Sequence, residues 1–559
     1  MKYLMFFFLL FFLTSTSFSQ GSGLSIGANY PIYPSTVSQT ETFITKHPTN
    51  KDILFSTANT ITFQPSFFVS EGVYATTNRG SSWFGSDTCN GANILFHQGD
   101  PGITIDKNGR FILTRLGRPP FYGIYSHFST DNGLTWSTQK QITRDGESLY
   151  ERASVIADNN PASNYYGRVY VAWVRLAGSF PVEFSFTDDI EQSWSNKIIV
   201  NSFSQRSSGP DIEIGLNGEV FVCYAIVSST SPFNEVAIAF AKSTNGGQNW
   251  SVNNNAFEVT GITGVLPTKS NIRVNGLPRI AVDKSNSQYR GTIYIVTTQR
   301  NRLPAGSDPD IILYKSTDNG NTWSQPIRVN QDNFNNGKIQ YFPAIDVDDY
   351  GGINIIYYDD RTTTSDSSSV FLSRSTDGGI TWTDYKISDK NFKPTPIGGL
   401  GQGYQGDNID IVSVENKIFP VWMDNRTGNY QIWTTPISFQ PNSVNNENVV
   451  PKDFILEQNY PNPFSAGASS FTSRNSGTKI SWQSPITGWQ TLKIYDILGN
   501  EIITLVNEFR EAGKYEIEFN PNVIDKKLAS GVYFYRLQIE NGSDSGLRFA
   551  ETKKMIVLP

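Results

Sequence analysis

The sequence predicts an all-β protein, and three observations support that prediction. The 559 residues include 26 Tyr, 37 Phe and 11 Trp beside 46 Gly and 28 Pro, a composition that suits short strands joined by tight turns. Alternating apolar stretches bounded by turn residues recur along the chain. A polar octet ending in Trp also returns at regular spacing, and a chain of this length exceeds one ordinary core, so we expect a large repeat architecture.

The first 19 residues have the features of a secretory signal peptide. One Lys precedes an apolar run from Leu4 to Leu13, and the small residues Ser17 and Ser19 suit cleavage before Gln20. The run is about half as long as a membrane-spanning helix requires. We therefore expect no transmembrane segment once the signal is removed.

Charge and cysteine content exclude several classes of protein. The net charge is -6 and no run of Lys and Arg occurs, so we expect no nucleic-acid partner. Cys89 and Cys223 are the only cysteines and lie in different repeats, which argues against a disulfide framework. We expect no cofactor.

Six copies of the octet organise residues 20–440. They begin at Thr76, Ser129, Thr187, Ser243, Ser316 and Ser375, at intervals of 53, 58, 56, 73 and 59 residues. Asp or Asn in third place can accept bonds from backbone amides, Gly in fifth place tolerates positive φ, and Trp buries a large ring. Structural roles are therefore predicted for Asn78, Trp83, Asp131, Trp136, Asn245, Trp250, Asp318, Trp323, Asp377 and Trp382.

Two details of the octets lead to further expectations. The third copy carries Glu191 where Gly is expected, so its turn should be distorted. The octets lack the alternating acidic ligands and terminal Glu of a calcium loop, and we expect no metal there. The pattern resembles the Asp-box, or BNR repeat, of sialidase-like propellers. This resemblance, over about residues 25 to 440, implies that each octet joins the third and fourth strands of a blade, on the face opposite the binding site.

Hairpin starts set the number of blades. They lie near Glu41, Pro101, Arg152, Pro210, Pro278, Pro343 and Asp407, which predicts seven blades, with six as the alternative that sialidases suggest. The last hairpin has no octet and supplies only three strands. A strand within residues 24–33 would complete that blade and close the ring.

The loops of the opposite face carry the candidate site. Resemblance to sialidases implies an arginine clamp for a sugar carboxylate, with Tyr404 as nucleophile and Glu151 as its partner. Ligand-binding roles are accordingly expected for Arg152, Arg300, Arg361, Arg426, Asp359, Tyr341 and Asp407. The sialidase Arg-Ile-Pro signature is missing from the first blade, and no acid Asp can be assigned. Alternatively, each Asp-x-Arg is a local ion pair that holds a loop.

Two classes of function remain open from the sequence. The first is a glycan-processing enzyme, either an exo-sialidase-like glycoside hydrolase or a polysaccharide lyase. A lyase base would be His97, because His47 and His127 lie in a turn and on a third strand. The second is a non-catalytic surface propeller that binds a ligand or serves adhesion. Both classes imply an extracellular glycan or another surface ligand as partner.

A second domain follows a polar linker at residues 441–453. Residues 454–559 alternate strands with Gly and Asn/Pro turns, which predicts a small β-sandwich. The segments "FILEQNYPNPF", "LKIYDILGNEIITLVN" and "LASGVYFYRLQ" resemble the type A sorting domain of the type IX secretion system. This resemblance implies passage through the periplasm, contact with the secretion machinery, and release or attachment at the outer-membrane cell surface.

Overall fold

The computed structural model divides into two compact units, Met1–Gln440 and Pro441–Pro559. It describes residues 23–64, 66–89, 96–144, 149–190, 192–201, 205–440, 453–465, 477–521, 528–541 and 546–558. The predicted signal peptide, Glu191 and all but the last residue of the predicted linker lie outside these ranges. Within them, the one helical element is a 3-10 turn, η1 (Pro267–Lys269), and none is long and apolar enough to cross a membrane.

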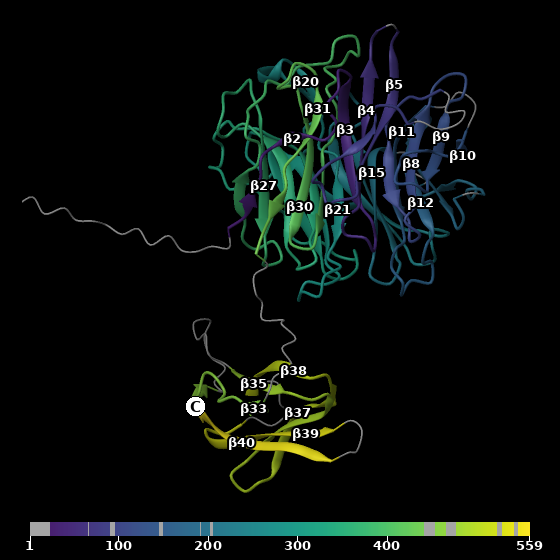
Figure 1. Ribbon diagram of the computed structural model, residues 1–559. Coiled ribbons are helices and arrows are strands. Elements are labelled where there is room, and N and C mark those ends of the chain that lie inside the picture. The colour runs from purple at the N-terminus through teal and green to yellow at the C-terminus, as the bar shows by residue number, and fades with distance from the viewer. Residues whose placement is uncertain are drawn as a thin grey trace, which may run out of the picture. The chain divides into compact units, whose positions relative to one another are not determined.

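Six four-stranded antiparallel sheets form the first six blades of unit 1 (Figure 1). Blade 1 contains β3 (Ser38–Lys46), β4 (Leu54–Thr62), β5 (Phe68–Thr76) and β6 (Phe84–Ser86); blade 2 contains β7 (Gly102–Ile105), β8 (Phe111–Gly117), β9 (Gly123–Ser129) and β10 (Lys140–Thr143); blade 3 contains β11 (Tyr150–Ala157), β12 (Val169–Arg175), β13 (Val182–Thr187) and β14 (Ile198–Ile199). Blade 4 contains β15 (Arg206–Ile214), β16 (Val220–Val227), β17 (Glu235–Ser243) and β18 (Ser251–Glu258); blade 5 contains β21 (Arg279–Val282), β22 (Ile293–Gln299), β23 (Asp310–Ser316) and β24 (Ile327–Arg328); blade 6 contains β25 (Gln340–Val347), β26 (Ile353–Asp359), β27 (Ser369–Ser375) and β28 (Thr383–Lys386).

Blade 7 combines both ends of unit 1. Its strands are β29 (Asp410–Val414), β30 (Lys417–Asp424), β31 (Gln431–Thr434) and the N-terminal β2 (Tyr30–Pro31), and β1 (Ser25–Ile26) pairs with β32 (Ile437–Ser438) beside them. Tyr30 pairs with Thr434 and Pro31 with Trp433. The prediction of an all-β, seven-bladed ring closed by an N-terminal strand is confirmed, and this closure removes the open edges of a linear array.

The octets lie between the third and fourth strands of blades 1 to 6, where they hold the turn between these strands by local hydrogen bonds. In the second copy, the hydroxyl of Ser129 donates to Asp131 Oδ1 at 2.7 Å, and that oxygen accepts from the amide of Thr135 at 2.9 Å. Gly133, at φ 86°, donates its amide to Ser129 Oγ, and the Trp136 indole donates to the Gly133 carbonyl. Serine and aspartate bond in the same way in the copies from Ser316 and Ser375.

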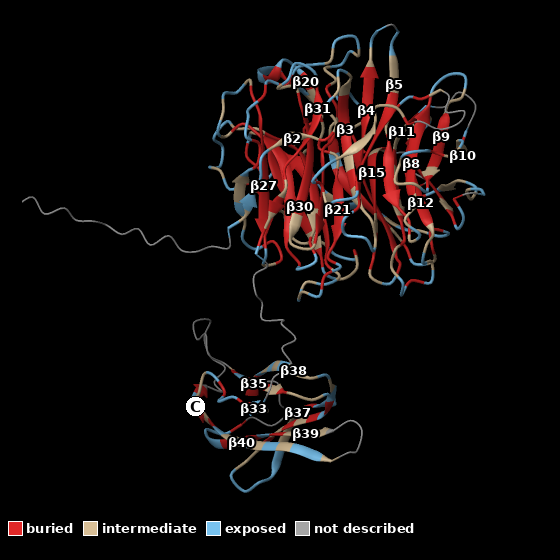
Figure 2. Cartoon of the chain, in the orientation of Figure 1, coloured by how far each residue is buried: buried red, intermediate tan, exposed pale blue. Residues whose placement is uncertain are grey.

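The core consists of the inner strands and the contacts between blades (Figure 2). All eight residues of β16 are buried, whereas exposed and half-buried residues alternate along the fourth strand β18. Rings of adjacent blades stack, as Phe55 of blade 1 does on Phe111 of blade 2 at 4.6 Å between centroids. Continuous apolar runs therefore form second strands that are covered on both faces.

First strands are irregular where they begin. The register shifts between Thr40 and Phe43 in β3 and between Glu151 and Ser154 in β11. Glu41, Asp100 and Arg152 adopt φ of 50°, 52° and 47°, in or just before the first strands of blades 1, 2 and 3. Bulges re-aim side chains and are common beside functional sites. These starts lie on the face opposite the octets, which we call the mouth face.

A hairpin inserted between blades 4 and 5 reaches blade 6. It comprises β19 (Gly264–Leu266), η1 and β20 (Ile272–Val274), and it falls in the longest interval between octets. Lys269 is fully buried at its tip and donates to Asp360 Oδ2 at 2.8 Å and to the carbonyls of Ser365 and Ser367. The hairpin is thereby fixed over the mouth face.

Unit 2 contains two sheets around one core. One sheet has β33 (Ile455–Leu456), β35 (Thr478–Ser484) and β38 (Gly513–Phe519). The other has β34 (Phe464–Ser465), β40 (Leu547–Leu558), β39 (Gly531–Asn541), β36 (Gly488–Tyr495) and β37 (Glu501–Arg510). Trp482 of the first sheet and Tyr535 and Leu537 of the second are buried in a shared apolar cluster. This arrangement matches the predicted β-sandwich.

Candidate functional site

Seven polar side chains gather where the first strands begin, and we call them the mouth cluster. Its members are Glu41, Asn59, Asp100, Glu151, Arg273, Tyr404 and Asp407. They come from blades 1, 2 and 3, from β20 and from the segment that leads into blade 7. Among the residues that the structure describes, no three His, Cys, Asp or Glu side chains are placed to hold a metal ion.

Asn59 connects two members of the mouth cluster. Its side-chain amide donates to the Tyr404 hydroxyl at 3.2 Å and to Asp100 Oδ1 at 3.4 Å, while its carbonyl oxygen accepts from the Asp100 amide at 2.7 Å. The Tyr404 hydroxyl also lies 3.2 Å from Thr40 Oγ1. Blade 1 therefore positions both the tyrosine and the carboxyl group of Asp100.

Arg273 forms the cationic part of the mouth cluster. Its Nε donates to Asp407 Oδ1 at 3.1 Å and its Nη2 donates to Asp407 Oδ2, so the pair is bidentate. The guanidinium lies 5.2 Å from the centroid of the Tyr404 ring. The Arg273 amide donates to the Gly403 carbonyl at 2.7 Å and thus joins β20 to the Tyr404 segment. Two charge-assisted hydrogen bonds of this kind fix the orientation of the carboxylate.

The other carboxyl groups of the mouth cluster have raised pKa values. Burial, followed by the charges of Asp100 and Asp407, raises the pKa of Glu151 to about 8. Burial and the same two carboxylates raise the pKa of Glu41 well above its ordinary value, and burial also raises that of Asp100. At neutral pH, Glu151 is therefore a protonated acid beside an ion-paired carboxylate, the pattern of an acid and base held apart by environment.

Tyr404 and Glu151, the predicted nucleophile and partner, both lie in the mouth cluster. Burial, and then the charge of Glu41, raise the pKa of Tyr404 well above its ordinary value. A tyrosine nucleophile needs activation toward its ionised form. In this environment Tyr404 stays protonated and serves as a hydrogen-bonding group, which argues against the nucleophile that the resemblance implied.

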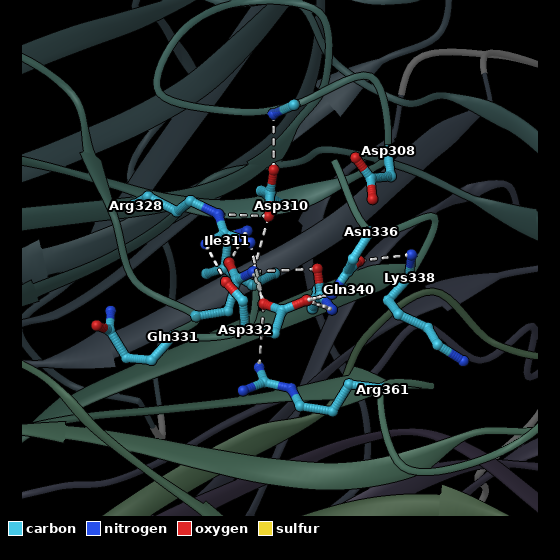
Figure 3. A network of polar contacts seen from close by, with 12 residues as sticks. Asp308, Asp310, Ile311, Arg328, Gln331, Asp332, Asn336, Lys338, Gln340 and Arg361 are labelled. Carbon is cyan, nitrogen blue, oxygen red and sulfur yellow. Dashed lines mark hydrogen bonds and ion pairs between the residues drawn. The ribbon is translucent and has the colours of Figure 1, made fainter. Parts of the chain in front are cut away.

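Arg361 belongs to a network between blades 5 and 6 rather than to the mouth cluster (Figure 3). Asp359 pairs with it and likewise lies apart from the mouth cluster. Arg361 Nε donates to Asp359 Oδ2 at 2.7 Å, and its guanidinium also pairs with Asp384 and lies 3.7 Å from Asp332. The Asp359 side chain is fully buried. Arg328 extends the network to Asp310 and Asp332, as Figure 3 shows. The Asp-x-Arg here is a structural ion pair, the alternative weighed above.

Three more predicted ligand-binding residues also lie apart. Arg426 pairs with Asp424 and Asp389 and lies over the Trp433 ring at 4.3 Å. Tyr341 is fully buried and its hydroxyl lies 2.9 Å from Ser368 Oγ. Arg300 directly follows β22, and its amide donates to the Thr260 carbonyl. Arg361 and Arg426 are thus each held by neighbouring aspartates, and no interaction in the described structure links Arg300, Arg361 or Arg426 to Arg152.

Neither His97 nor His127 offers an accessible base. His97 is 3% exposed, and its Nδ1 contacts the buried Glu71 carboxylate. His127 is fully buried beside Arg115, and burial followed by that positive charge lowers the pKa of His127 to about 3. His97 as a lyase base is therefore contradicted by its burial.

Sequence reasoning missed four members of the mouth cluster: Glu41, Asn59, Asp100 and Arg273. The signals were present for three of them. Glu41 stands at a predicted hairpin start, Asp100 immediately precedes another at Pro101, and Arg273 lies in the octet interval of 73 residues. Asn59 gave no signal, because it is one polar residue in an otherwise ordinary second strand.

Comparisons with known proteins find distant similarity among solved structures. No protein-family model matches the chain, and no curated protein matches it. Several solved structures do match it. One is a PL25 ulvan lyase bound to -[GlcA(1-4)Rha3S]-, with 12% sequence identity, 68% of this chain and 89% of that chain covered, and a TM-score of 0.42. Another is a Penicillium chrysogenum alpha-L-arabinanase complexed with arabinobiose, with 14% identity, 63% of this chain and 98% of that chain covered, and a TM-score of 0.42. A further match is the Hadza microbial sialidase Hz136, with 12% identity, 68% of this chain and 73% of that chain covered, and a TM-score of 0.39. The sheets of unit 1 themselves make it a β-propeller, and its similarity to these carbohydrate-active proteins is distant.

Proposed function

We propose that the propeller is a glycoside hydrolase that cleaves an extracellular glycan at the mouth cluster. The observation that supports this assignment is the contrast between two carboxyl groups at the mouth. Glu151 has a pKa of about 8 and holds its proton at neutral pH, whereas Asp407 is paired with Arg273 through both oxygens. Glycosidic cleavage requires one carboxylic acid and one carboxylate.

The two groups take complementary roles. Glu151 donates its proton to the glycosidic oxygen as the bond from that oxygen to the anomeric carbon breaks. The Asp407 carboxylate accepts a proton from the water that attacks the anomeric carbon, and solvent then restores both groups. Arg273 orients Asp407, and Tyr404 donates a hydrogen bond to a sugar hydroxyl. Both catalytic groups rest on strand starts or anchored segments, which keeps them in place.

The charge of the mouth cluster favours a neutral glycan over an acidic one. Four carboxyl groups face one guanidinium, and Asp407 already neutralises that guanidinium. An exo-sialidase needs several free arginines around the sugar carboxylate, but Arg361 and Arg426 are held by neighbouring aspartates. We therefore favour a neutral sugar at the cleavage point over the sialoside that the octets suggested.

The test measures sugar release by the purified full chain from a panel of neutral oligosaccharides, sialosides and uronate-containing glycans. We expect cleavage within the neutral set, with E151Q and D407N each reducing kcat about 10²-fold or more because general acid–base catalysis contributes at least that factor. E258Q is the matched control, because Glu258 is exposed on the fourth strand of blade 4 and pairs only with Arg302 in the described structure. Binding without cleavage across the panel would favour the adhesion function, and full activity of E151Q would refute the mechanism.

We also propose that residues 454–559 direct export by the type IX route, after an N-terminal signal peptide has taken the chain to the periplasm. The quoted sequence segments support this proposal, as does the separate core of unit 2. Deletion of residues 454–559 should leave the propeller in the periplasm of a host with that machinery. Unchanged delivery to the medium or the cell surface would contradict the proposal.

A further inference from the structure

The hairpin between β4 and β5 carries two exposed phenylalanines on the mouth face. Phe63 is 38% exposed and Phe67 is 52% exposed, and their ring centroids lie 5.7 Å apart. Figure 1 shows β4 and β5 reaching beyond the neighbouring strands at this face. Single exposed apolar side chains are common, but adjacent exposed aromatic rings at the rim of a candidate site are typical of a binding surface. We call this pair the aromatic platform.

The neighbouring Phe68 shows that the same hairpin can cover an aromatic ring with contacts from the protein itself. The Phe68 ring lies 6.2 Å from the His97 ring, and the Arg118 guanidinium lies 5.5 Å from the Phe68 centroid. Phe68 is half-buried as a result. The aromatic platform, in contrast, leaves large parts of both rings in water, which costs free energy that a bound ligand would recover.

Two connections make the aromatic platform continuous with the mouth cluster. Asn59, whose amide donates to the Tyr404 hydroxyl, is four residues before Phe63 on the same hairpin. The backbone of Gly399 lies against Phe63 so closely that a Cβ there would be 3.1 Å from Phe63 Cε1. Gly399 belongs to the segment that carries Tyr404, which is closed by a bond from the Ile397 amide to the Tyr404 carbonyl at 2.7 Å. The platform and Tyr404 therefore belong to one surface.

The two segments that form this surface are uncharged. Residues 59–70 and 394–406 contain no Asp, Glu, Lys, Arg or His. Gln64 is exposed next to Phe63 and offers both amide donors and an acceptor. The face of an aromatic ring carries partial negative charge and attracts C–H groups. A neutral sugar presents C–H groups on its faces and hydroxyls at its edge, so an aromatic face flanked by an amide fits it.

We propose that the aromatic platform is a sugar-binding subsite, at which a neutral sugar residue of the glycan stacks on Phe63 and Phe67. This role presupposes the hydrolase function proposed above and adds a preference for long chains. Four residues of extended strand from Asn59 to Phe63 span about 13 Å, so only an oligosaccharide of several residues can fill the mouth cluster and the platform together. The platform holds the chain and takes no part in breaking the bond.

The test compares neutral disaccharides with neutral hexasaccharides of the same sugars, taken from the panel described above, on the purified full chain. F63A/F67A should raise KM for the hexasaccharide about tenfold, because each stacked ring contributes a factor of a few. The kcat for the hexasaccharide, and both constants for the disaccharide, should stay unchanged. Titration calorimetry on E151Q, with and without F63A/F67A, should show the same loss of affinity in the absence of turnover.

Further variants identify ring stacking as the cause. F63Y/F67Y keeps both flat rings and should retain the affinity for the hexasaccharide. F63L/F67L keeps apolar bulk but loses the rings, and it should bind as weakly as F63A/F67A. Y350A is the matched control and should bind like the wild type, because Tyr350 is an aromatic of similar exposure, 50%, in the turn between β25 and β26, away from the mouth face.

The outcomes distinguish failure of this subsite from failure of the proposed hydrolysis. Hexasaccharide cleavage with an unchanged KM in F63A/F67A, or an equal loss for both chain lengths, would overturn the subsite and leave the hydrolase intact. Hexasaccharide binding that depends on the two rings but leads to no cleavage would support the subsite and contradict the hydrolase. Sedimentation with phosphatidylcholine vesicles that depends on the two rings, at unchanged sugar affinity, would assign the platform to a lipid surface instead. A wild-type chain that binds no sugar of the panel would overturn both proposals.

Discussion

Replacing Lys269 with methionine should detach the hairpin that carries Arg273. The lysine is fully buried, and its ammonium donates to Asp360 at 2.8 Å and to two carbonyls at 2.9 and 2.8 Å. Methionine keeps the apolar stem but leaves Asp360 buried without its cation. Breaking a buried pair from one side costs about 3–5 kcal/mol. We expect about 3 kcal/mol, the lower end, because Asp360 still accepts the amide of Ile339 at 2.8 Å.

Urea denaturation gives the free energy of unfolding, and hydrogen exchange of residues 264–274 shows where the loss occurs. We expect faster exchange in β19 and β20 and a weaker hold on the Arg273–Asp407 pair. K390M is the matched control, since Lys390 is an exposed lysine near blade 6. The double variant K269M/D360N should recover part of the loss by removing the stranded charge. A change below about 1 kcal/mol, or unaltered exchange in the hairpin, would refute the reasoning.

Three further predictions concern individual carboxylates and one arginine. Glu151 has a pKa of about 8 in the folded protein, against roughly 4.3 in the unfolded chain. The stability that it contributes below pH 4 should therefore be lost as the pH rises toward 8. E151Q should flatten that part of a curve of Tm against pH. Hydrogen bonds from Thr322 lower the pKa of Asp318 to about 2. The contribution of Asp318 to folding stability is therefore present above pH 4 and lost as the pH falls toward 2. D318A should remove this acid dependence and cost about 1 kcal/mol of stability at neutral pH, as measured by calorimetry. R361A should lower the free energy of unfolding by about 3 kcal/mol in urea denaturation, because Asp359 stays buried without its cation. Glycan affinity at the mouth should stay unchanged. A loss of affinity in titration calorimetry would show instead that Arg361 belongs to the binding site.

The sequence allowed prediction of the blades because each octet is a local structure. Hydroxyl, carboxylate and glycine within a few residues satisfy one another, as Ser129, Asp131 and Gly133 do, so the turn requires no distant partner. Turns of one type fix which strand is third and which is fourth. The missing seventh octet likewise indicated that the last blade is completed from the other end of the chain.

The mouth could be predicted only in part, because its side chains depend on distant partners and on bulges. Arg361 seemed free in the sequence, but Asp384 of β28 reaches it across the same blade. Tyr341 precedes a register shift, and a shift of one residue changes which face a side chain occupies. Arg273 lies in the long interval between two octets, and only the folded hairpin of β19 and β20 brings it to Asp407.

The closure of blade 7 imposes an order on the synthesis and folding of this protein. β2 is among the first segments to be made, but its partner strand β31 lies about four hundred residues later. Pairing between such distant residues is slow, because a very long loop must close before any contact rewards it. The early strand must therefore wait, unpaired, until nearly the whole of unit 1 exists. Until β31 has been made, unit 1 is an incomplete ring that stays open at blade 7.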